Sequence, residues 1–212
     1  MKDKIDAIYR ILDSTYPDTR CALTFTNPLE LLVASILSAQ CTDERVNEVT
    51  SRLFKKYKTA ADYASAETSV LEDEVHSTGF FRNKAKAIRE CAGMINERHG
   101  GTVPKTMEEL VALPGIGRKT ANLVLTCGFN KAGIVVDTHV FRLSRRIGLT
   151  NQSDSEKIEF ELRETIKESR WSHFSLLLTS HGRAICKAKK PLCPVCPIRH
   201  QCEYFANNPT AS

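Results

Sequence analysis

The chain of 212 residues carries 30 Lys and Arg against 25 Asp and Glu, with 42% hydrophobic residues, an ordinary globular composition that excludes a disordered protein. Its longest stretch without a charged residue, 31–42, is far shorter than the roughly twenty apolar residues of a membrane-spanning helix, so we expect no membrane protein. The first residues alternate in charge where a secretion signal would be apolar, so we expect a cytosolic chain with reduced thiols.

Apolar residues recur at helical spacing through most of the chain. The first three apolar stripes lie within 5–12, 31–38 and 46–57. Further helices are predicted over 60–65, 67–76, 82–97, 107–112, 118–128, 138–146, 154–169 and 172–183. One extended run, 133–136, is too short and too solitary to build a sheet. The sequence therefore predicts an all-α fold.

A tight turn between two of these helices has the features of an anion site. Thr106 begins a Thr-x-x-Glu capping box, and Pro114 ends the short helix that follows it. Gly115 and Gly117 allow a positive φ and leave room for backbone amides to approach a ligand. Together with the N-terminus of the next helix, at Arg118, these amides form a site shaped for one phosphate. A plain turn with two glycines is the alternative.

The eight cysteines fall into two groups. Four are scattered among apolar neighbours and are expected in the core: Cys21, Cys41, Cys91 and Cys127. The other four have the spacing C-x6-C-x2-C-x5-C: Cys186, Cys193, Cys196 and Cys202. Such a cluster in a cytosolic chain indicates a metal site. Four thiolates suit zinc or an iron-sulfur cluster, and a single short Cys-x2-Cys pair favours iron-sulfur.

The positive charge is concentrated in two segments. Residues 79–146 hold 12 basic and 5 acidic residues, a net of +7, and residues 186–212 hold 4 and 1, a net of +3. The remaining segments, 1–78 and 147–185, are slightly acidic. Separated positive segments indicate a surface for a polyanion such as nucleic acid, because Lys and Arg displace counterions from phosphates. Solvated helix faces are the alternative.

Three motifs follow one another at fitting separations. They are Leu113-Pro114-Gly115-Ile116-Gly117-Arg118-Lys119, Val136-Asp137-Thr138-His139 and the four C-terminal cysteines. In this combination, and over nearly its whole length, the chain resembles the endonuclease III family of base excision repair, DNA glycosylases that also act as lyases at abasic (AP) sites. The resemblance implies two helical lobes with a DNA-binding cleft between them. Residues 21–132 would carry the helix-hairpin-helix, and residues 1–20 plus 133–212 a [4Fe-4S] cluster held by the four cysteines.

The resemblance also implies a reaction. Oxidised pyrimidines would be removed, and the strand would be nicked 3′ of the abasic site by β-elimination. Lys119 would form a Schiff base, and Asp137 would stabilise the oxocarbenium-like state. The helix N-terminus and Arg118 disfavour the charged form of the Lys119 amine, which suits a nucleophile. From the residues alone, Lys119 could equally be a phosphate contact and Asp137 a helix N-cap.

An enzyme that cuts out a base must first take it out of the stack and fill the gap. By resemblance, Gln40 and Phe80 are the residues that enter the duplex, and His139 lies beside the DNA. Phe80 departs from the aliphatic residue that the family often has there. The remaining expected DNA contacts are Arg82, Lys84, Gly115, Gly117, Arg118, Lys187, Lys189 and Lys190.

Monofunctional adenine or thymine mismatch glycosylases are the alternative function. They carry a residue other than lysine, commonly Tyr or Ser, where this chain has Lys119, and the adenine enzyme needs a glutamate in place of Ser35. A non-catalytic helix-hairpin-helix module would need neither the Lys119 and Asp137 pair nor a cluster. We therefore expect a monomeric enzyme, in the cytoplasm at the nucleoid, that acts on double-stranded DNA with an oxidised pyrimidine or an abasic site.

Overall fold

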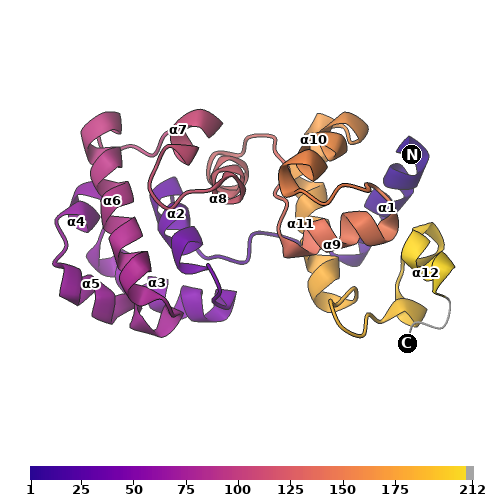
Figure 1. The fold of residues 1–212 in the computed structure, drawn as a ribbon, viewed down its shortest axis with the longest axis horizontal. Coiled ribbons are helices and arrows are strands. Elements are labelled where there is room, and N and C mark those ends of the chain that lie inside the picture. The colour runs from indigo at the N-terminus through magenta and orange to yellow at the C-terminus, as the bar shows by residue number, and fades with distance from the viewer. Residues whose placement is uncertain (209–212) are drawn as a thin grey trace. The chain divides into compact units, whose positions relative to one another are not determined.

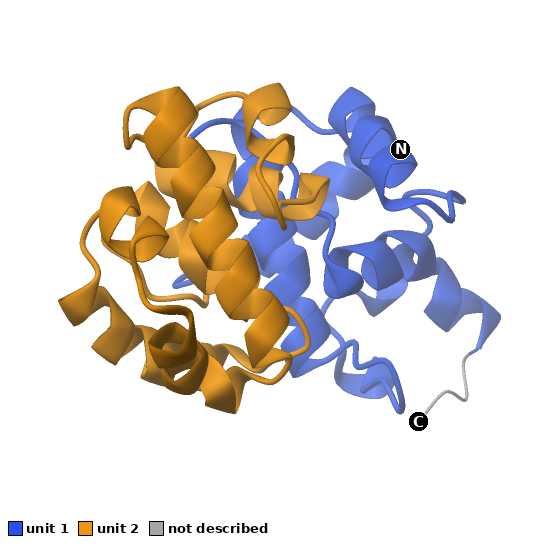
Figure 2. Ribbon diagram, turned by 60° about the vertical axis from the view of Figure 1, so that its left-hand side comes forward, with its two compact units in different colours: residues 1–20, 131–212 blue, residues 21–130 orange. Residues whose placement is uncertain are grey.

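The computed structural model describes residues 1–208, and within them every regular element is helical (Figure 1). This confirms the predicted all-α fold. The chain divides into two compact units (Figure 2): Cys21–Asn130 is one, and Met1–Arg20 with the chain from Lys131 onward is the other. Each unit has its own hydrophobic core. Across residues 1–208, no helix combines the length and the apolar character that a bilayer crossing requires.

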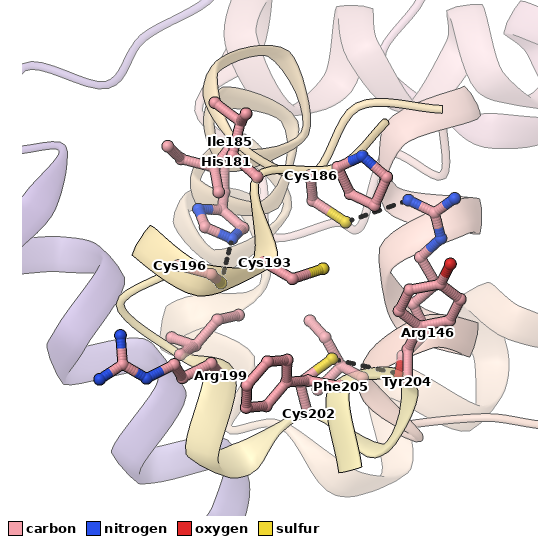
Figure 3. A pocket seen from close by; sticks show the side chains of 14 residues that line it. Arg146, His181, Ile185, Cys186, Cys193, Cys196, Arg199, Cys202, Tyr204 and Phe205 are labelled. Atoms are coloured by element: carbon pink, nitrogen blue, oxygen red, sulfur yellow. Dashed lines mark hydrogen bonds between the residues drawn. The ribbon is translucent and has the colours of Figure 1, made fainter. Parts of the chain in front are cut away.

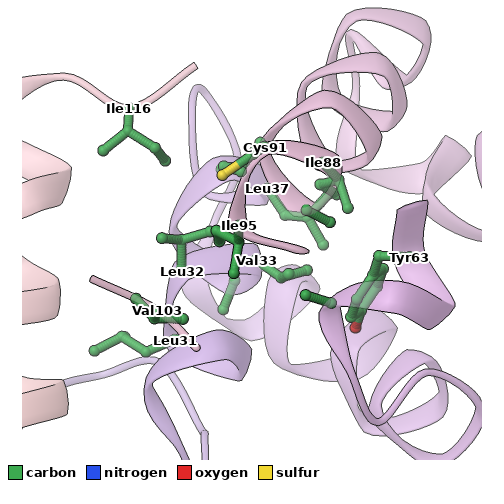
Figure 4. Packing of buried hydrophobic residues seen from close by; sticks show 14 of the residues in the cluster. Leu31, Leu32, Val33, Leu37, Tyr63, Ile88, Cys91, Ile95, Val103 and Ile116 are labelled. Carbon is green, nitrogen blue, oxygen red and sulfur yellow. The ribbon is translucent and has the colours of Figure 1, made fainter. Parts of the chain in front are cut away.

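The unit Cys21–Asn130 is organised around α2 (Pro28–Leu37) and the long helix α6 (Phe81–His99). Its other elements are α3 (Asp43–Lys56), α4 (Ala60–Ala64), α5 (Thr68–Val75), the 3-10 turn η1 (His76–Thr78), α7 (Met107–Val111), α8 (Arg118–Leu123) and the π turn η2 (Val124–Gly128). Every residue from Leu31 to Leu37 is buried, because α3, α6 and α8 all contact α2. Ile88 and Ile95 of α6 belong to the same apolar cluster (Figure 4).

The second unit joins the N-terminal helix α1 (Lys2–Thr15) to the C-terminal part of the chain. Its other elements are α9 (Thr138–Ile147), α10 (Ser155–Thr165), η3 (Glu168–Arg170), α11 (Trp171–Ala184), η4 (Cys193–Val195), η5 (Arg199–Gln201) and α12 (Glu203–Asn207). Helix α11 contacts both α1 and α9, and Ile8, Leu143 and Leu177 are fully buried in their shared core. This core therefore fixes both the start of α9 and the end of α11.

The scattered cysteines lie in or against the core of the unit Cys21–Asn130, as predicted. Cys91 is fully buried in α6, and its burial raises the pKa of the thiol to about 12. Cys21, Cys41 and Cys127 are half-buried and pack against the same apolar cluster. These thiols thus serve as small core side chains.

One predicted helix is shorter than expected. The helix predicted over 154–169 ends at Thr165, because Ile166 adopts an extended backbone. The Ile166 carbonyl accepts a hydrogen bond from Trp171 Nε1 at 2.9 Å, and the Ile166 side chain is buried. These contacts stabilise a break that no glycine or proline marks in the sequence.

Candidate nucleic-acid interface and catalytic residues

The predicted hairpin joins α7 to α8. Thr106 begins α7 as expected, because its Oγ1 accepts a hydrogen bond from the Glu109 backbone N–H at 3.3 Å. Gly115 has a φ of +76°, and a Cβ placed on it would lie 3.0 Å from the Cβ of Ala87. Glycine is therefore favoured there by both conformation and space. A positive φ at Gly117 is not used: this residue is the N-cap of α8, with a φ of −90°.

Lys119 lies in the first turn of α8, directly after the hairpin, and is exposed. Leu113, Ile116 and Ala121 on either side are buried in the core of their unit. The backbone around Lys119 is thereby held in place while its amine stays accessible. A primary amine in this position can attack an electrophile or contact a phosphate.

Asp137 is the N-cap of α9, one of the two roles that its position suggested. Its Oδ1 accepts hydrogen bonds from the backbone N–H groups of His139 and Val140, both at 2.8 Å. Its Oδ2 lies 3.2 Å from Thr179 Oγ1 of α11, which shares its one proton between this oxygen and the Ser175 carbonyl at 3.0 Å. Thr179 carries no sequence signal for this contact, which joins residues far apart in the chain. Together the three bonds fix the orientation of a half-buried carboxylate.

His139 is half-buried between α9 and α11. A Cβ placed on Gly182 would lie only 2.7 Å from His139 Nδ1, so the glycine makes room for the ring. Burial lowers the pKa of His139, the charges of Arg142 and Arg183 lower it further, and Asp137 opposes them. These effects together favour the neutral form of the imidazole.

The two residues expected to enter DNA share an unusual backbone conformation. Gln40 follows α2 with a φ of +53°, and Phe80 precedes α6 with a φ of +47°. The same left-handed conformation occurs at Asn130 and Lys190. In residues other than glycine it costs about 1–3 kcal/mol and concentrates at functional positions. Gln40 is exposed, and Phe80 is 63% exposed although it is a large apolar side chain.

The basic residues at the start of α6 differ sharply in exposure. The Arg82 side chain is 79% exposed, with its Nε 4.0 Å from Glu72 Oε2. Lys84 is only 5% exposed, and its Nζ donates hydrogen bonds to the carbonyl oxygens of Leu37 at 2.8 Å and Thr78 at 2.7 Å. The phosphate contact predicted for Lys84 is therefore corrected: its ammonium group faces the interior of its own unit.

The four clustered cysteines line one pocket beyond the end of α11 (Figure 3). Cys186 follows α11, Cys193 opens η4, Cys196 follows η4, and Cys202 precedes α12. Figure 3 shows the sulfur atoms of Cys186, Cys193 and Cys202 around a common hollow. Apolar side chains, among them Ile147, Ile185 and Ile198, also line the pocket. Successive short turns thus bring four thiols to one place.

The chemistry of this donor set fits the iron-sulfur prediction. Burial, together with the neighbouring thiols Cys202, Cys186 and Cys193, raises the pKa of Cys196 to about 11, against the lowering effect of a backbone hydrogen bond from Ile198. The four thiols lie around one pocket. A [4Fe-4S] cluster, with one cysteine on each iron, suits such an arrangement.

Two arginines of α9 hold the chain at the first cysteine. Arg142 donates hydrogen bonds to the Cys186 carbonyl, from Nε at 3.1 Å and Nη2 at 2.8 Å. Arg146 donates to Cys186 Sγ at 3.4 Å and to the carbonyls of Lys187 at 2.8 Å and Ala188 at 3.0 Å. The sequence reasoning assigned neither arginine a role, although their i, i+4 spacing places them on one helix face. The loop leaves three lysines exposed: Lys187, Lys189 and Lys190.

Known proteins are similar to this chain over most of its length. A family profile described as HhH-GPD superfamily base excision DNA repair protein matches residues 33–168. The endonuclease III of Synechocystis sp. is 50% identical over 202 residues, which cover 95% of this chain and 92% of the relative. The endonuclease III of Bacillus subtilis is 45% identical over 188 residues, covering 88% of this chain and 86% of the relative.

Solved structures give the same result in three dimensions. A structure of a trapped endonuclease III–DNA covalent intermediate has 41% sequence identity and a TM-score of 0.93, and the match covers 98% of both chains. A thermostable thymine-DNA glycosylase matches with a TM-score of 0.86 at 22% identity, over 97% of this chain and 98% of that one. The second match is a likeness of fold alone.

Proposed function

The chain belongs to the endonuclease III family of HhH-GPD base excision repair proteins, and on that premise we propose how its own residues act. It is a DNA glycosylase and AP lyase. We propose that it removes oxidised pyrimidines such as thymine glycol, with Lys119 as nucleophile and Asp137 as the stabilising carboxylate. The observation that carries this proposal is an exposed lysine in the first turn after the hairpin.

In the first step the bond between C1′ of the sugar and the base nitrogen breaks. Its electron pair leaves with the base, which takes up a proton, and positive charge develops at C1′. The Asp137 carboxylate stabilises this charge. Its Oδ1 is held by two backbone N–H groups, whereas Oδ2 carries one side-chain hydrogen bond, from Thr179. We infer that Oδ2 is the atom that faces the sugar.

In the second step Lys119 Nζ bonds to C1′, and the sugar ring opens with a proton going to O4′. The result is an iminium, a protonated Schiff base between Lys119 and the sugar. This group acidifies C2′, and loss of a C2′ proton expels the 3′ phosphate with the electron pair of its C–O bond. Water then hydrolyses the imine, which releases Lys119 and leaves a nicked strand.

Binding to DNA draws on residues from several elements. The hairpin amides and the helix start at Arg118 suit one phosphate, and Arg82 with Lys187, Lys189 and Lys190 supplies further positive charge. Gln40 and Phe80 fill the gap that the extruded nucleotide leaves. The exposure and left-handed backbone of both residues support this role. His139 contributes a neutral ring beside the DNA.

The cysteines Cys186, Cys193, Cys196 and Cys202 would hold a [4Fe-4S] cluster. When bound, the cluster supplies a rigid cross-link among the turns that carry them. Arg142 and Arg146 position the same loop through its carbonyl groups, so that its lysines face solvent. The proposed role of this segment is therefore architectural.

The remaining proposals concern the molecule as a whole. Residues 21–132 form the hairpin lobe, and residues 1–20 with the chain from 133 onward form the cluster lobe, a division that the two compact units support for the described residues; 209–212 lie outside these. The proposed reaction requires Lys119 and Asp137, one from each unit, to act on the same nucleotide. The enzyme works as a monomer on double-stranded DNA, at the nucleoid.

The nucleophile is tested with Lys119→Gln and a duplex that carries a preformed abasic site. The substitution removes the amine that forms the Schiff base, so strand nicking and borohydride trapping should both fall to background. Lys55→Gln makes the same chemical change at an exposed lysine of α3 and should leave both activities at the wild-type level.

The same assay, extended to duplexes that hold a mismatched adenine or thymine, separates the competing functions. Full trapping by Lys119→Gln would overturn the role of Lys119. A wild-type protein that excises a mismatched adenine or thymine but makes no nick at the abasic site would identify the monofunctional alternative. A protein that only binds DNA would identify the non-catalytic module.

A further inference from the structure

Lys84 connects the two segments that carry the proposed DNA-inserting residues. Its Nζ donates hydrogen bonds to the carbonyls of Leu37 at 2.8 Å and Thr78 at 2.7 Å. Leu37 is the last residue of α2, and Gln40 follows it by three positions. Thr78 is the last residue of η1, and Phe80 follows it by two. One ammonium group therefore bridges two chain segments that lie about forty residues apart.

Both carbonyls end a helical segment, where backbone oxygens lack partners within the helix, and at Leu37 the negative end of the α2 dipole adds to this. A cation is the appropriate ligand for two such oxygens in a buried place. Lys84 is 5% exposed, and burial lowers its pKa, with the nearby Cys41 acting in the opposite direction. A buried charge is costly unless hydrogen bonds compensate it. The two carbonyl oxygens provide these bonds and so stabilise the buried ammonium group.

Lys84 also contacts the second segment through its backbone. Its N–H donates a hydrogen bond to the carbonyl of Phe80 at 3.1 Å, in the first turn of α6. The start of α6, the end of η1 and the end of α2 are thus joined through a single residue. Gln40 and Phe80, the exposed left-handed residues, stand directly beyond the joined points.

We propose that Lys84 is a positioning residue that holds the Gln40 and Phe80 segments in register, so that both side chains enter the duplex together. This inference rests on the proposed function of Gln40 and Phe80. It assigns to Lys84 a role in nucleotide extrusion and none in phosphate binding. Loss of the ammonium group would leave two buried carbonyls without a partner and would let the two segments move independently.

The test compares Lys84→Met with wild type on a duplex that holds thymine glycol next to 2-aminopurine, whose fluorescence rises when stacking is lost. The variant should bind the duplex with a Kd within twofold of wild type and with the same slope of log affinity against log salt. Its fluorescence rise and its base excision should both be at least tenfold slower. Lys55→Met, the same change at an exposed lysine, should match wild type in every measurement.

A double-mutant cycle distinguishes positioning from general destabilisation. If Lys84 acts through the inserting residues, Lys84→Met should add little to the defect of Phe80→Ala, because the two changes remove the same event. Multiplicative defects, or a Lys84→Met variant that extrudes the nucleotide at the wild-type rate, would overturn the inference. A wild-type protein that gives no fluorescence rise, or a Phe80→Ala variant without a defect, would instead contradict the proposed function.

A second variant covers the case in which Lys84→Met unfolds. Lys84→Gln keeps one amide donor and a similar volume, and it should show an intermediate rate. Hydrogen exchange should then be faster than in wild type at the amides of 38–41 and 79–81, while α3 stays unchanged. Unchanged exchange in both segments together with a wild-type extrusion rate would contradict the inference.

Discussion

Asp137 illustrates how one side chain can serve structure and chemistry at once. Its two hydrogen bonds from the backbone of α9 cap the helix, and the bond from Thr179 ties the same carboxylate to α11. A carboxylate bound in this way keeps its orientation without help from substrate. Preorganised charge is worth most where charge develops in a transition state, so the capping role supports the catalytic one.

His139 leads to a prediction about pH. Burial lowers its pKa below the ordinary value of about 6.5, so the folded protein disfavours the protonated ring. The stability that the neutral ring provides is present above about pH 6.5 and is lost as the pH falls below that value toward the folded pKa. We therefore expect the urea midpoint to drop less between pH 7.5 and pH 5.5 in His139→Gln than in wild type. An equal drop in both proteins would show that His139 does not contribute.

At the scale of elements, short sequence motifs correctly predicted the helix starts and turns that depend on neighbouring residues. The hairpin, the cap at Asp137 and the α7 start at Thr106 each depend on residues a few positions apart, and each was recognisable in the sequence. The break after Thr165 could not be recognised in the sequence, because no glycine or proline marks it. A hydrogen bond from the Trp171 side chain supports it instead. Lys84 was misassigned for a related reason: only packing against α2 and η1 makes it internal.

The loop after Cys186 presents three lysines whose part in DNA binding can be measured. Its lysines are exposed, and Arg146 fixes its backbone through the carbonyls of Lys187 and Ala188. If the three lysines contact phosphates, replacing Lys187, Lys189 and Lys190 together by alanine should flatten the slope of log affinity against log salt by about three. Lys55→Ala should leave the slope unchanged. Parallel salt lines for the triple variant and wild type would exclude this loop from the DNA interface.

At the scale of the whole molecule, the excess positive charge belongs to both units. The basic segment 79–146 begins in the unit Cys21–Asn130 and ends in the other one. There the loop after Cys186 adds Lys187, Lys189 and Lys190. The sequence could identify these segments and their motifs, because they are contiguous. It could not identify Thr179 beside Asp137 or the bridge from Lys84 to Leu37, because these pairs are 42 and 47 positions apart in the chain.

The central claim is that Lys119 forms the covalent bond to the sugar. The most direct measurement is peptide mass spectrometry of the wild-type protein after reaction with an abasic-site duplex, borohydride reduction and digestion with nuclease and protease. We predict that the reduced sugar remnant lies on the peptide that contains Lys119, at its ε-amine. A remnant on another lysine or on the N-terminal amine, with Lys119 unmodified, would contradict the account.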